Sequence, residues 1–450
     1  MREHSGLLTD LYELTMAAGY LQTRFDADAT FELFVRHLPP HRNYLVAAGL
    51  ETALEFLENV HFTAEEIKFL RQHPVFQAIG DEFFDYLAKF RFTGDVWAMP
   101  EGTLLFAGEP MLRVHAPIIE GQIMETYLLA TVSYQTMIAS KAARVVTAAQ
   151  GRQVVEFGAR RAHGPLASLM AARAAAIGGC MGTSNVLAGQ HFGMEVYGTQ
   201  AHSWVMAHEN ESEAFAHFLD AFPEHSVLLL DTYDVKNAVK RIVKMGRKPQ
   251  GVRLDSGDLA KDSRWVRKEL DRAGWKDVKI FASGDLDETR ITKLLREGAA
   301  IDSFGVGTAL ATPGDAPHLN LVYKLVEVER EGKVREAAKL SRAKVTYPGR
   351  KQVFRDSSAS GEWRGDRIAL EGEAANGGEP LLVEVMRGGK RVAPAEPIAK
   401  LRERCVMGLE RLPEKYRQIF KAAEYPVRYS KKLEAMLERV RKRIRRSALK

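Results

Sequence analysis

The chain has 450 residues, of which 46% are hydrophobic, so it can bury a large core and form two or three domains. No segment approaches the roughly 18 uncharged residues of a membrane span, and the N-terminal MREHSGLLTDLYELTMAAGY lacks the apolar run of an export signal. The net charge is only +6, and the two cysteines, Cys180 and Cys405, exclude a disulfide scaffold or a multi-cysteine zinc site and suit a reducing cytoplasm.

Both flanks of the chain are predicted to contain antiparallel strands. ATFELFVR from Ala29 and DVWAMPEGTLLFAGEPMLRVHAP from Asp95 alternate like strands, with turn signals at residues 100–102 and 108–110. The C-terminal flank has LVYKLVEVEREGKVREAAKL, KQVFRD and LLVEVMRGGKRV, the last with a Gly388-Gly389 turn. The sequence alone allows two separate β domains or one discontinuous domain.

The middle of the chain, from about residue 150 to 310, predicts repeated βα units and a parallel sheet. Apolar β-type runs alternate there with helical patterns such as DVKNAVKRIVKMG, whose apolar stripe is closed by Gly246. The runs are VVEFGAR, MEVYGT, SVLLLD, GVRLDSG, KIFASGD and AIDSFGVGT, beginning at Val154, Met194, Ser226, Gly251, Lys279 and Ala300. Six such units predict a barrel, which need not be complete.

Small or polar residues follow each of these runs, at the edge where ligands collect in parallel α/β folds. ASGD (282–285) and GVGT (305–308) can close backbone N–H groups around a phosphate, and Thr308 adds a hydroxyl. Each tetrapeptide alone is weak evidence, because Gly and Ser commonly end strands simply as turn formers. Two in succession resemble the phosphate site of a barrel, which makes the phosphate interpretation about as good as the turn interpretation.

The RLDSGD motif supplies Arg253, Asp255 and Asp258 at a strand end, a set suited to holding a pyrophosphate through Mg²⁺ and charge. Asp258 is better placed to cap the helix that begins at Leu259. Asp255 lies too early in the sequence to cap that helix. It is therefore the candidate Mg²⁺ ligand.

Two further strand ends carry basic residues. EFGARRAHG places Arg160 and Arg161 side by side, where either can bind phosphate or form a structural ion pair. GTQAHS presents Thr199 and His202, and a histidine at such a position can act as acid, base or nucleophile, or simply be hydrogen-bonded.

The basic C-terminal segment has two interpretations. Residues 431–450 carry nine Lys or Arg against two Glu, a local balance of +7 that leaves the rest of the chain near −1. The segment can contact nucleic acid or another acidic surface, but a solvated terminal helix is the simpler explanation.

Other enzyme classes lack support in the sequence. No G-x-x-x-x-G-K-[ST] motif occurs, and no G-x-G-x-x-G follows a predicted strand, which argues against a P-loop kinase and a dinucleotide fold. The residues alone therefore predict an α/β enzyme that binds a phosphorylated, Mg²⁺-linked substrate.

At these motifs the chain closely resembles the nicotinate phosphoribosyltransferase family. The resemblance is carried by LLTDLYELTMAAGY, FELFVRHLP, EFGARRAHG, GTSNVLAG, GTQAHSWV, RLDSGDL, ASGD, GVGTAL, KVTYPGRKQVFR and EYPVRYS, which together span nearly the whole chain. It implies an irregular (β/α) barrel at residues 121–325. It also implies a discontinuous α/β sandwich domain formed by residues 1–120 and 326–450, the latter ending in the basic helical tail.

The resemblance also implies roles for individual residues. Tyr12, Thr199 and Arg253 are expected to contact nicotinate, and His202 is expected to be transiently phosphorylated by ATP. The ribose 5-phosphate is expected to bind Ser283, Gly284, Gly307 and Thr308, and the pyrophosphate to bind near Arg160 and Arg161. Family members are commonly cytoplasmic homodimers with shared active sites, which would bring Tyr12 to the barrel of the second copy. One departure is Ala130, at a position where the family often has Asn.

The implied reaction joins nicotinate to phosphoribosyl pyrophosphate, with Mg²⁺ as cofactor and ATP as co-substrate, in NAD biosynthesis by the Preiss-Handler route. Enzymes of this kind are ATP-coupled and classed among the ligases. The nearest rivals are nicotinamide and quinolinate phosphoribosyltransferases, which share the chemistry but not the full set of motifs. A catalytically silent scaffold or a nucleic-acid binder that uses the basic tail is the alternative from another class.

Overall fold

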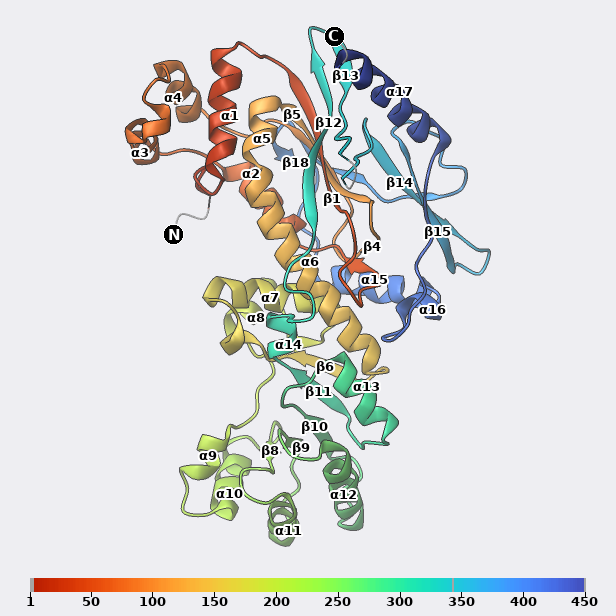
Figure 1. The fold of residues 1–450 in the computed structure, drawn as a ribbon. Helices are drawn as coiled ribbons and strands as arrows, with labels where there is room; N and C mark the ends of the chain where they lie inside the picture. Colours follow the sequence, from red (N-terminus) through yellow and green to blue (C-terminus); the bar gives the residue numbers. More distant parts are fainter. Residues whose placement is uncertain (1–3, 342–343, 449–450) are drawn as a thin grey trace. The chain divides into compact units, whose positions relative to one another are not determined.

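A computed structural model describes residues 4–341 and 344–448, and the chain is a mixed α/β protein (Figure 1). The chain forms two compact units. The first comprises Met1–Met137, His318–Glu396 and Met407–Lys450, and the second comprises Ile138–Pro317 and Pro397–Val406. Two helices, α6 (Glu125–Ala148) and α15 (Ile398–Arg411), contain residues of both units.

The first unit contains a seven-stranded antiparallel sheet of order β13-β12-β1-β5-β3-β17-β18. Its strands are β1 (Asp28–Val35), β3 (Asp95–Ala98), β5 (Pro110–Pro117), β12 (Leu321–Arg330), β13 (Lys333–Glu336), β17 (Val383–Arg387) and β18 (Lys390–Arg391). The antiparallel strands predicted in both flanks are therefore confirmed. Because β1 pairs with both β5 and β12, the two flanks share this one sheet.

A second, four-stranded sheet of order β16-β14-β15-β19 belongs to the same unit. Its strands are β14 (Lys351–Ser357), β15 (Trp363–Leu370), β16 (Glu379–Pro380) and β19 (Val427–Tyr429), while β2 (Leu45–Val46) pairs separately with β4 (Leu104–Leu105). Buried charges join the two larger sheets, since Lys351 Nζ lies 2.8 Å from a carboxylate oxygen of Glu32 on β1. Burial lowers the pKa of Lys351, although the Glu32 carboxylate opposes this shift.

Helices complete the first unit. They are α1 (Leu11–Gln22), α2 (Leu50–Asn59), α3 (Ala64–Gln72), α4 (Asp81–Ala88), α5 (Ile118–Ile123), α16 (Glu414–Arg417) and α17 (Lys431–Ala448), with a 3₁₀ turn at Pro74–Phe76. The predicted terminal helix is thus confirmed as α17, which packs on β15. Leu433, Leu437 and Val440 are buried, and most of the basic side chains of the helix that the structure describes are exposed.

The second unit is built on a six-stranded parallel sheet of order β7-β6-β11-β10-β9-β8. The strands are β6 (Gln153–Glu156), β7 (Gly182–Thr183), β8 (Val227–Leu229), β9 (Gly251–Leu254), β10 (Lys279–Ala282) and β11 (Ser303–Val306). Five of the six predicted runs contain these strands. The run from Met194 was wrongly predicted as a strand: β7 takes the position beside β6, and Val196 adds only a single bridge to Thr183.

Local sequence signals account for several helix ends in this unit. Its helices are α7 (Pro165–Ile177), α8 (Val186–Phe192), α9 (His202–Met206), α10 (Glu211–Ala221), α11 (Val235–Met245), α12 (Leu259–Arg272), α13 (Glu288–Arg296) and α14 (Thr308–Ala311), with a 3₁₀ turn at Ala159–Arg161. As predicted, Gly246 ends α11 with φ +68°, and the Asp258 carboxylate accepts the Lys261 N–H to cap α12.

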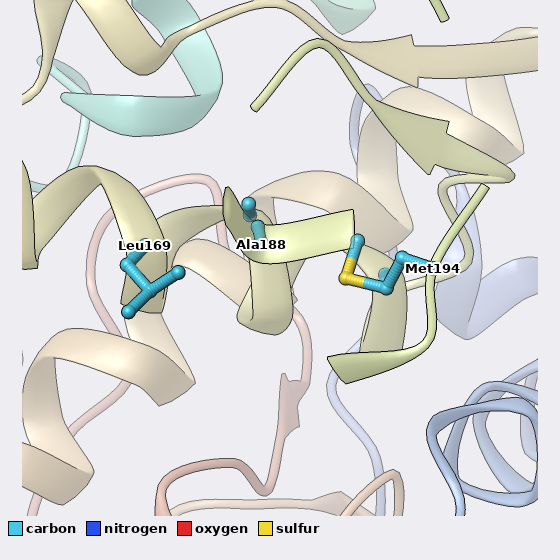
Figure 2. Packing of buried hydrophobic residues seen from close by; sticks show 5 residues of the cluster. Leu169, Ala188 and Met194 are labelled. Carbon is cyan, nitrogen blue, oxygen red and sulfur yellow. The ribbon is translucent and has the colours of Figure 1, made fainter. Parts of the chain in front are cut away.

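Small residues allow α7 and α8 to pack closely. Leu169, Ala172 and Ala176 of α7 meet Ala188 of α8 and Met194 in a buried cluster (Figure 2). This packing supports the segment between the two helices, which contains β7 and the GTSN motif.

Candidate active site

The polar groups predicted at the strand ends meet around Arg253 on β9. Its guanidinium donates hydrogen bonds from Nε to Ser283 Oγ at 2.8 Å, from Nη1 to Thr199 Oγ1 at 3.0 Å and from Nη2 to Asp255 Oδ1 at 2.5 Å. Only 13% of the Arg253 side chain is exposed. The structure therefore brings three of the predicted loop motifs, GTQAHS, RLDSGD and ASGD, to one point.

Asp255 connects Arg253 with His202. Its Oδ1 also accepts a hydrogen bond from Ser283 at 2.5 Å, while Oδ2 lies 3.8 Å from Nε2 of His202. Burial alone would raise the pKa of Asp255, but the hydrogen bond from Ser283 and the charge of Arg253 outweigh burial and lower it. Asp255 is therefore a carboxylate at neutral pH. Its Oδ1 accepts two hydrogen bonds, and its Oδ2 lies near the His202 imidazole.

His202 is the first residue of α9, and 42% of its side chain is exposed. Its Nδ1 lies 3.1 Å from the hydroxyl of Thr232, in the loop after β8. A hydroxyl on one ring nitrogen and a carboxylate beside the other fix the orientation of the ring. An accessible, oriented imidazole can accept a group or a proton.

The two small-residue loops follow β10 and β11. Gly284 has φ +90°, and a Cβ there would clash with the carbonyl oxygen of Asp255. A Cβ at Gly307 would lie 2.9 Å from the carbonyl oxygen of Phe157. Both positions therefore require glycine for space. Thr308 is exposed at the start of α14.

Arg160 and Arg161 lie exposed in the 3₁₀ turn after β6. Within the part of the chain that the structure describes, neither side chain forms an ion pair, so the structural alternative finds no support there. The buried Glu156 carboxylate holds this segment in place, because it accepts a hydrogen bond from the Gly158 N–H and one from the Thr183 hydroxyl at 2.6 Å. The two guanidinium groups remain available to an anion.

Tyr12 belongs to the first unit, whereas the residues of the Arg253 group belong to the second. It lies on α1 and is 47% exposed, next to the exposed side chains of Leu8, Leu11 and Met16. Burial of part of the ring, followed by the charge of Glu125, raises the pKa of Tyr12. The phenol is therefore protonated at neutral pH. Ala130 is exposed on α6.

Three residues near the site were not singled out from the sequence. The ring of Phe157 lies 5.8 Å from the Arg253 guanidinium, Thr232 contacts His202, and the Asp231 carboxylate accepts a hydrogen bond from the Asp255 N–H at 3.1 Å. All three lie in the strand-end motifs EFGARR and LLLDTYD. The sequence placed these residues at strand ends, but it did not predict their contacts, because the residues that they contact are distant along the chain.

Two kinds of feature are absent from residues 4–341 and 344–448. No helix in these ranges is both long and apolar enough to cross a membrane. No group of three or more His, Cys, Asp or Glu side chains in the same ranges is arranged to hold a metal ion.

Comparison with protein families covers most of the chain. The nicotinate phosphoribosyltransferase N-terminal domain matches residues 7–133, the nicotinate phosphoribosyltransferase family model matches residues 152–365, and the C-terminal domain of the same family matches residues 375–437.

Similar proteins carry the same name. A nicotinate phosphoribosyltransferase of Mycobacterium tuberculosis is 44% identical over 450 residues, covering 98% of this chain and 95% of that protein. One from Bacillus subtilis is 43% identical, covering 82% of this chain and 77% of that protein. The crystal structure of human nicotinic acid phosphoribosyltransferase superposes with a TM-score of 0.83 at 29% identity, covering 96% of this chain and 99% of that one. The chain belongs to the nicotinate phosphoribosyltransferase family.

Proposed function

We propose that the protein joins nicotinate to phosphoribosyl pyrophosphate, forming nicotinate mononucleotide and pyrophosphate in the biosynthesis of NAD. The observation that carries this proposal is the hydrogen-bonded group of Arg253, Thr199, Ser283 and Asp255. It places a fixed guanidinium beside the loops that suit a phosphorylated sugar. The proposed substrates are an aromatic carboxylate and a sugar phosphate that carries pyrophosphate.

Arg253 is proposed to bind the nicotinate carboxylate, with the Thr199 hydroxyl as a second donor. The neighbouring Phe157 ring offers an apolar face on which the pyridine ring can stack. Tyr12 is proposed to reach the base from a second copy of the chain. Charge-assisted hydrogen bonds to a guanidinium favour a carboxylate over a neutral amide.

The sugar phosphate is proposed to bind at the loops after β10 and β11. The backbone N–H groups near Ser283, Gly284 and Gly307 and the hydroxyl of Thr308 are donors suited to the ribose 5-phosphate. Arg160 and Arg161 are proposed to pair with the pyrophosphate group, because guanidinium groups match phosphate oxygens.

The reaction is a displacement at the anomeric carbon. The ring nitrogen of nicotinate supplies the electron pair for the new N–C bond, while the C–O bond to pyrophosphate breaks and pyrophosphate leaves with that electron pair. Positive charge develops on the ribose ring in the transition state. The protein contributes alignment of the two partners and compensation of charge on the departing pyrophosphate.

His202 is proposed to accept a phosphoryl group from ATP, so that ATP hydrolysis favours product formation. Its exposed ring and its contact with Thr232 support this role. Phosphorylation forms an N–P bond as the bond between the β- and γ-phosphates of ATP breaks, and ADP leaves. Water later hydrolyses the N–P bond and releases phosphate.

Asp255 is proposed as a ligand for Mg²⁺ together with substrate oxygens, since Mg²⁺ binds few carboxylates and keeps other oxygen ligands. The neighbouring Asp231 supports the fit: within residues 4–341 and 344–448, its buried Oδ1 has no hydrogen-bond partner. When bound, Mg²⁺ would neutralise charge on the pyrophosphate.

We propose that the parallel sheet is part of an irregular barrel, that the shared sheet of both flanks belongs to an α/β sandwich domain, and that the protein is a cytoplasmic homodimer. Each unit exposes apolar side chains that a second copy can cover, which supports the dimer. On α1 and just before it they are Leu8, Leu11, Tyr12 and Met16; around α7 and α8 they are Leu166, Val186, Leu187 and Val196.

The decisive test is pyrophosphate release from phosphoribosyl pyrophosphate with nicotinate, nicotinamide or quinolinate, each with and without ATP. We expect release with nicotinate and stimulation by ATP. Release only with one of the other bases would identify a rival phosphoribosyltransferase. No release with any base, together with salt-dependent DNA binding, would instead favour a nucleic-acid-binding protein that uses the α17 charges.

A further inference from the structure

The loop that follows β10 has an unusual backbone. Gly284 and Asp285 both have positive φ angles, +90° and +48°, and the next residue, Leu286, is buried. Gly284 needs no side chain, but Asp285 occupies a region that L residues with a Cβ adopt at a cost. Contacts from outside the loop can therefore stabilise this conformation.

Arg290, on α13, makes those contacts. Its Nη1 donates to the carbonyl oxygens of Gly284 at 3.0 Å and Asp285 at 3.4 Å. Because the N–H and C=O of a trans peptide point in opposite directions, the N–H groups of Asp285 and Leu286 must face away from Arg290. Among residues 4–341 and 344–448, neither of these N–H groups has a protein acceptor.

The helix that carries Arg290 is itself anchored. Asp287 caps α13 by accepting the Arg290 N–H at 2.7 Å. The buried Glu288 forms ion pairs with Lys141 at 2.5 Å and with Arg144 at 3.1 Å. The Arg290 guanidinium therefore extends toward the loop from a helix that is held in place.

We infer that Arg290 is a positioning residue for the ribose 5-phosphate, which it serves by holding two carbonyl groups away from the phosphate so that the N–H groups of Asp285 and Leu286 face it. The inference rests on the proposed function of this loop. A carbonyl turned toward the phosphate would place a negative dipole end against an anion, whereas an N–H donates to it. Losing Arg290 should therefore weaken the binding of the phosphate without changing the binding of nicotinate.

The test compares Arg290→Met, which keeps most of the side chain's length, with Arg290→Lys and with Lys293→Ala as a matched control. Lys293 lies on the same helix, 75% exposed, and pairs only weakly with Glu297 at 3.9 Å. For Arg290→Met we expect the KM for phosphoribosyl pyrophosphate to rise about tenfold, equivalent to about 1.4 kcal/mol. The KM for nicotinate should stay unchanged. Because Nη1 alone reaches both carbonyls, the single ammonium of Arg290→Lys should restore part of the loss.

A binding measurement separates this inference from the proposed reaction. Calorimetric titration with ribose 5-phosphate should show the same tenfold weakening in Arg290→Met and no change in Lys293→Ala. Unchanged binding, or an equal rise in both KM values accompanied by a lower melting temperature, would overturn the positioning role. If wild-type protein binds ribose 5-phosphate but releases no pyrophosphate, the proposed function fails while Arg290 is still tested.

Discussion

Replacing Arg253 with alanine should convert a protein selective for the acid into one that barely distinguishes nicotinate from nicotinamide. The two bases have nearly the same shape, so packing cannot separate them strongly, and discrimination depends on the carboxylate. Removing one member of a hydrogen-bonded charge pair costs about 2–5 kcal/mol, or roughly 30-fold to a few thousand-fold. We expect wild type to disfavour nicotinamide by at least the lower factor, and Arg253→Ala to lose that much efficiency with nicotinate alone.

The structure also sets a stability cost for the same substitution. Arg253 pairs with Asp255 at 2.5 Å, and the Asp255 side chain is 26% exposed. Without the guanidinium, Asp255 keeps its hydrogen bond from Ser283 at 2.5 Å and stays partly solvated. We therefore expect Arg253→Ala to lower the free energy of unfolding by about 1–2 kcal/mol. This loss lowers the melting temperature by about 2–8 °C in a unit of this size.

The assay measures kcat/KM for both bases in wild type, Arg253→Ala and Arg253→Lys, alongside melting temperatures. Arg253→Lys keeps the charge but not the three-way geometry, so it should recover only part of the selectivity. Equal losses for nicotinate and nicotinamide, together with a lower melting temperature, would mean that Arg253 serves only to pair with Asp255. That result would refute the carboxylate assignment.

Three further predictions concern His202, Glu109 and the C-terminal helix. His202→Ala should abolish an acid-labile phosphoryl adduct and uncouple ATP hydrolysis from nucleotide synthesis while basal synthesis survives, and an adduct that persists in the variant, mapped by mass spectrometry, would assign the role elsewhere. Burial raises the pKa of Glu109 well above its usual value, so folding retains a proton that the unfolded chain releases, and stability falls as pH rises above about 4.5. Glu109→Gln should therefore gain stability relative to wild type as pH rises, and parallel stability curves in urea at about pH 5 and about pH 8 would contradict this. Deleting residues 444–450 should leave activity and stability intact, whereas deletion from residue 438 removes the buried Val440 and should cost about 1.5–3 kcal/mol.

Features governed by neighbouring residues were predictable from the sequence. Asp258 caps α12 and Gly246 ends α11 because capping depends on residues within one helical turn. The apolar runs that became β6 and β8 to β11 were likewise visible, since a buried parallel strand requires a short apolar segment.

Features that depend on distant pairing were not predictable. The run from Met194 has a strand-like composition, yet the place beside β6 is taken by Gly182–Thr183. The pairing of β1 with β12, nearly 300 residues later, likewise decides that the two flanks share a sheet. Strand composition indicates that a segment can pair, but the choice of neighbour depends on the rest of the fold.

Asp255 shows the same limit at the level of a single side chain. Its place in RLDSGD identified it as a functional carboxylate, and Arg253 belongs to the same motif, but its other two neighbours, Ser283 and His202, come from separate segments that are distant along the chain. Because Oδ1 already accepts two hydrogen bonds, Oδ2 is the oxygen left to face a cation or the imidazole. The carboxylate that fixes the proposed base-binding arginine is thus also the one beside the proposed phosphoryl acceptor. A change in charge at His202 must therefore act on the Asp255 carboxylate, and through it on Arg253. The proposed binding of nicotinate and the proposed phosphorylation by ATP are thus coupled through this one carboxylate.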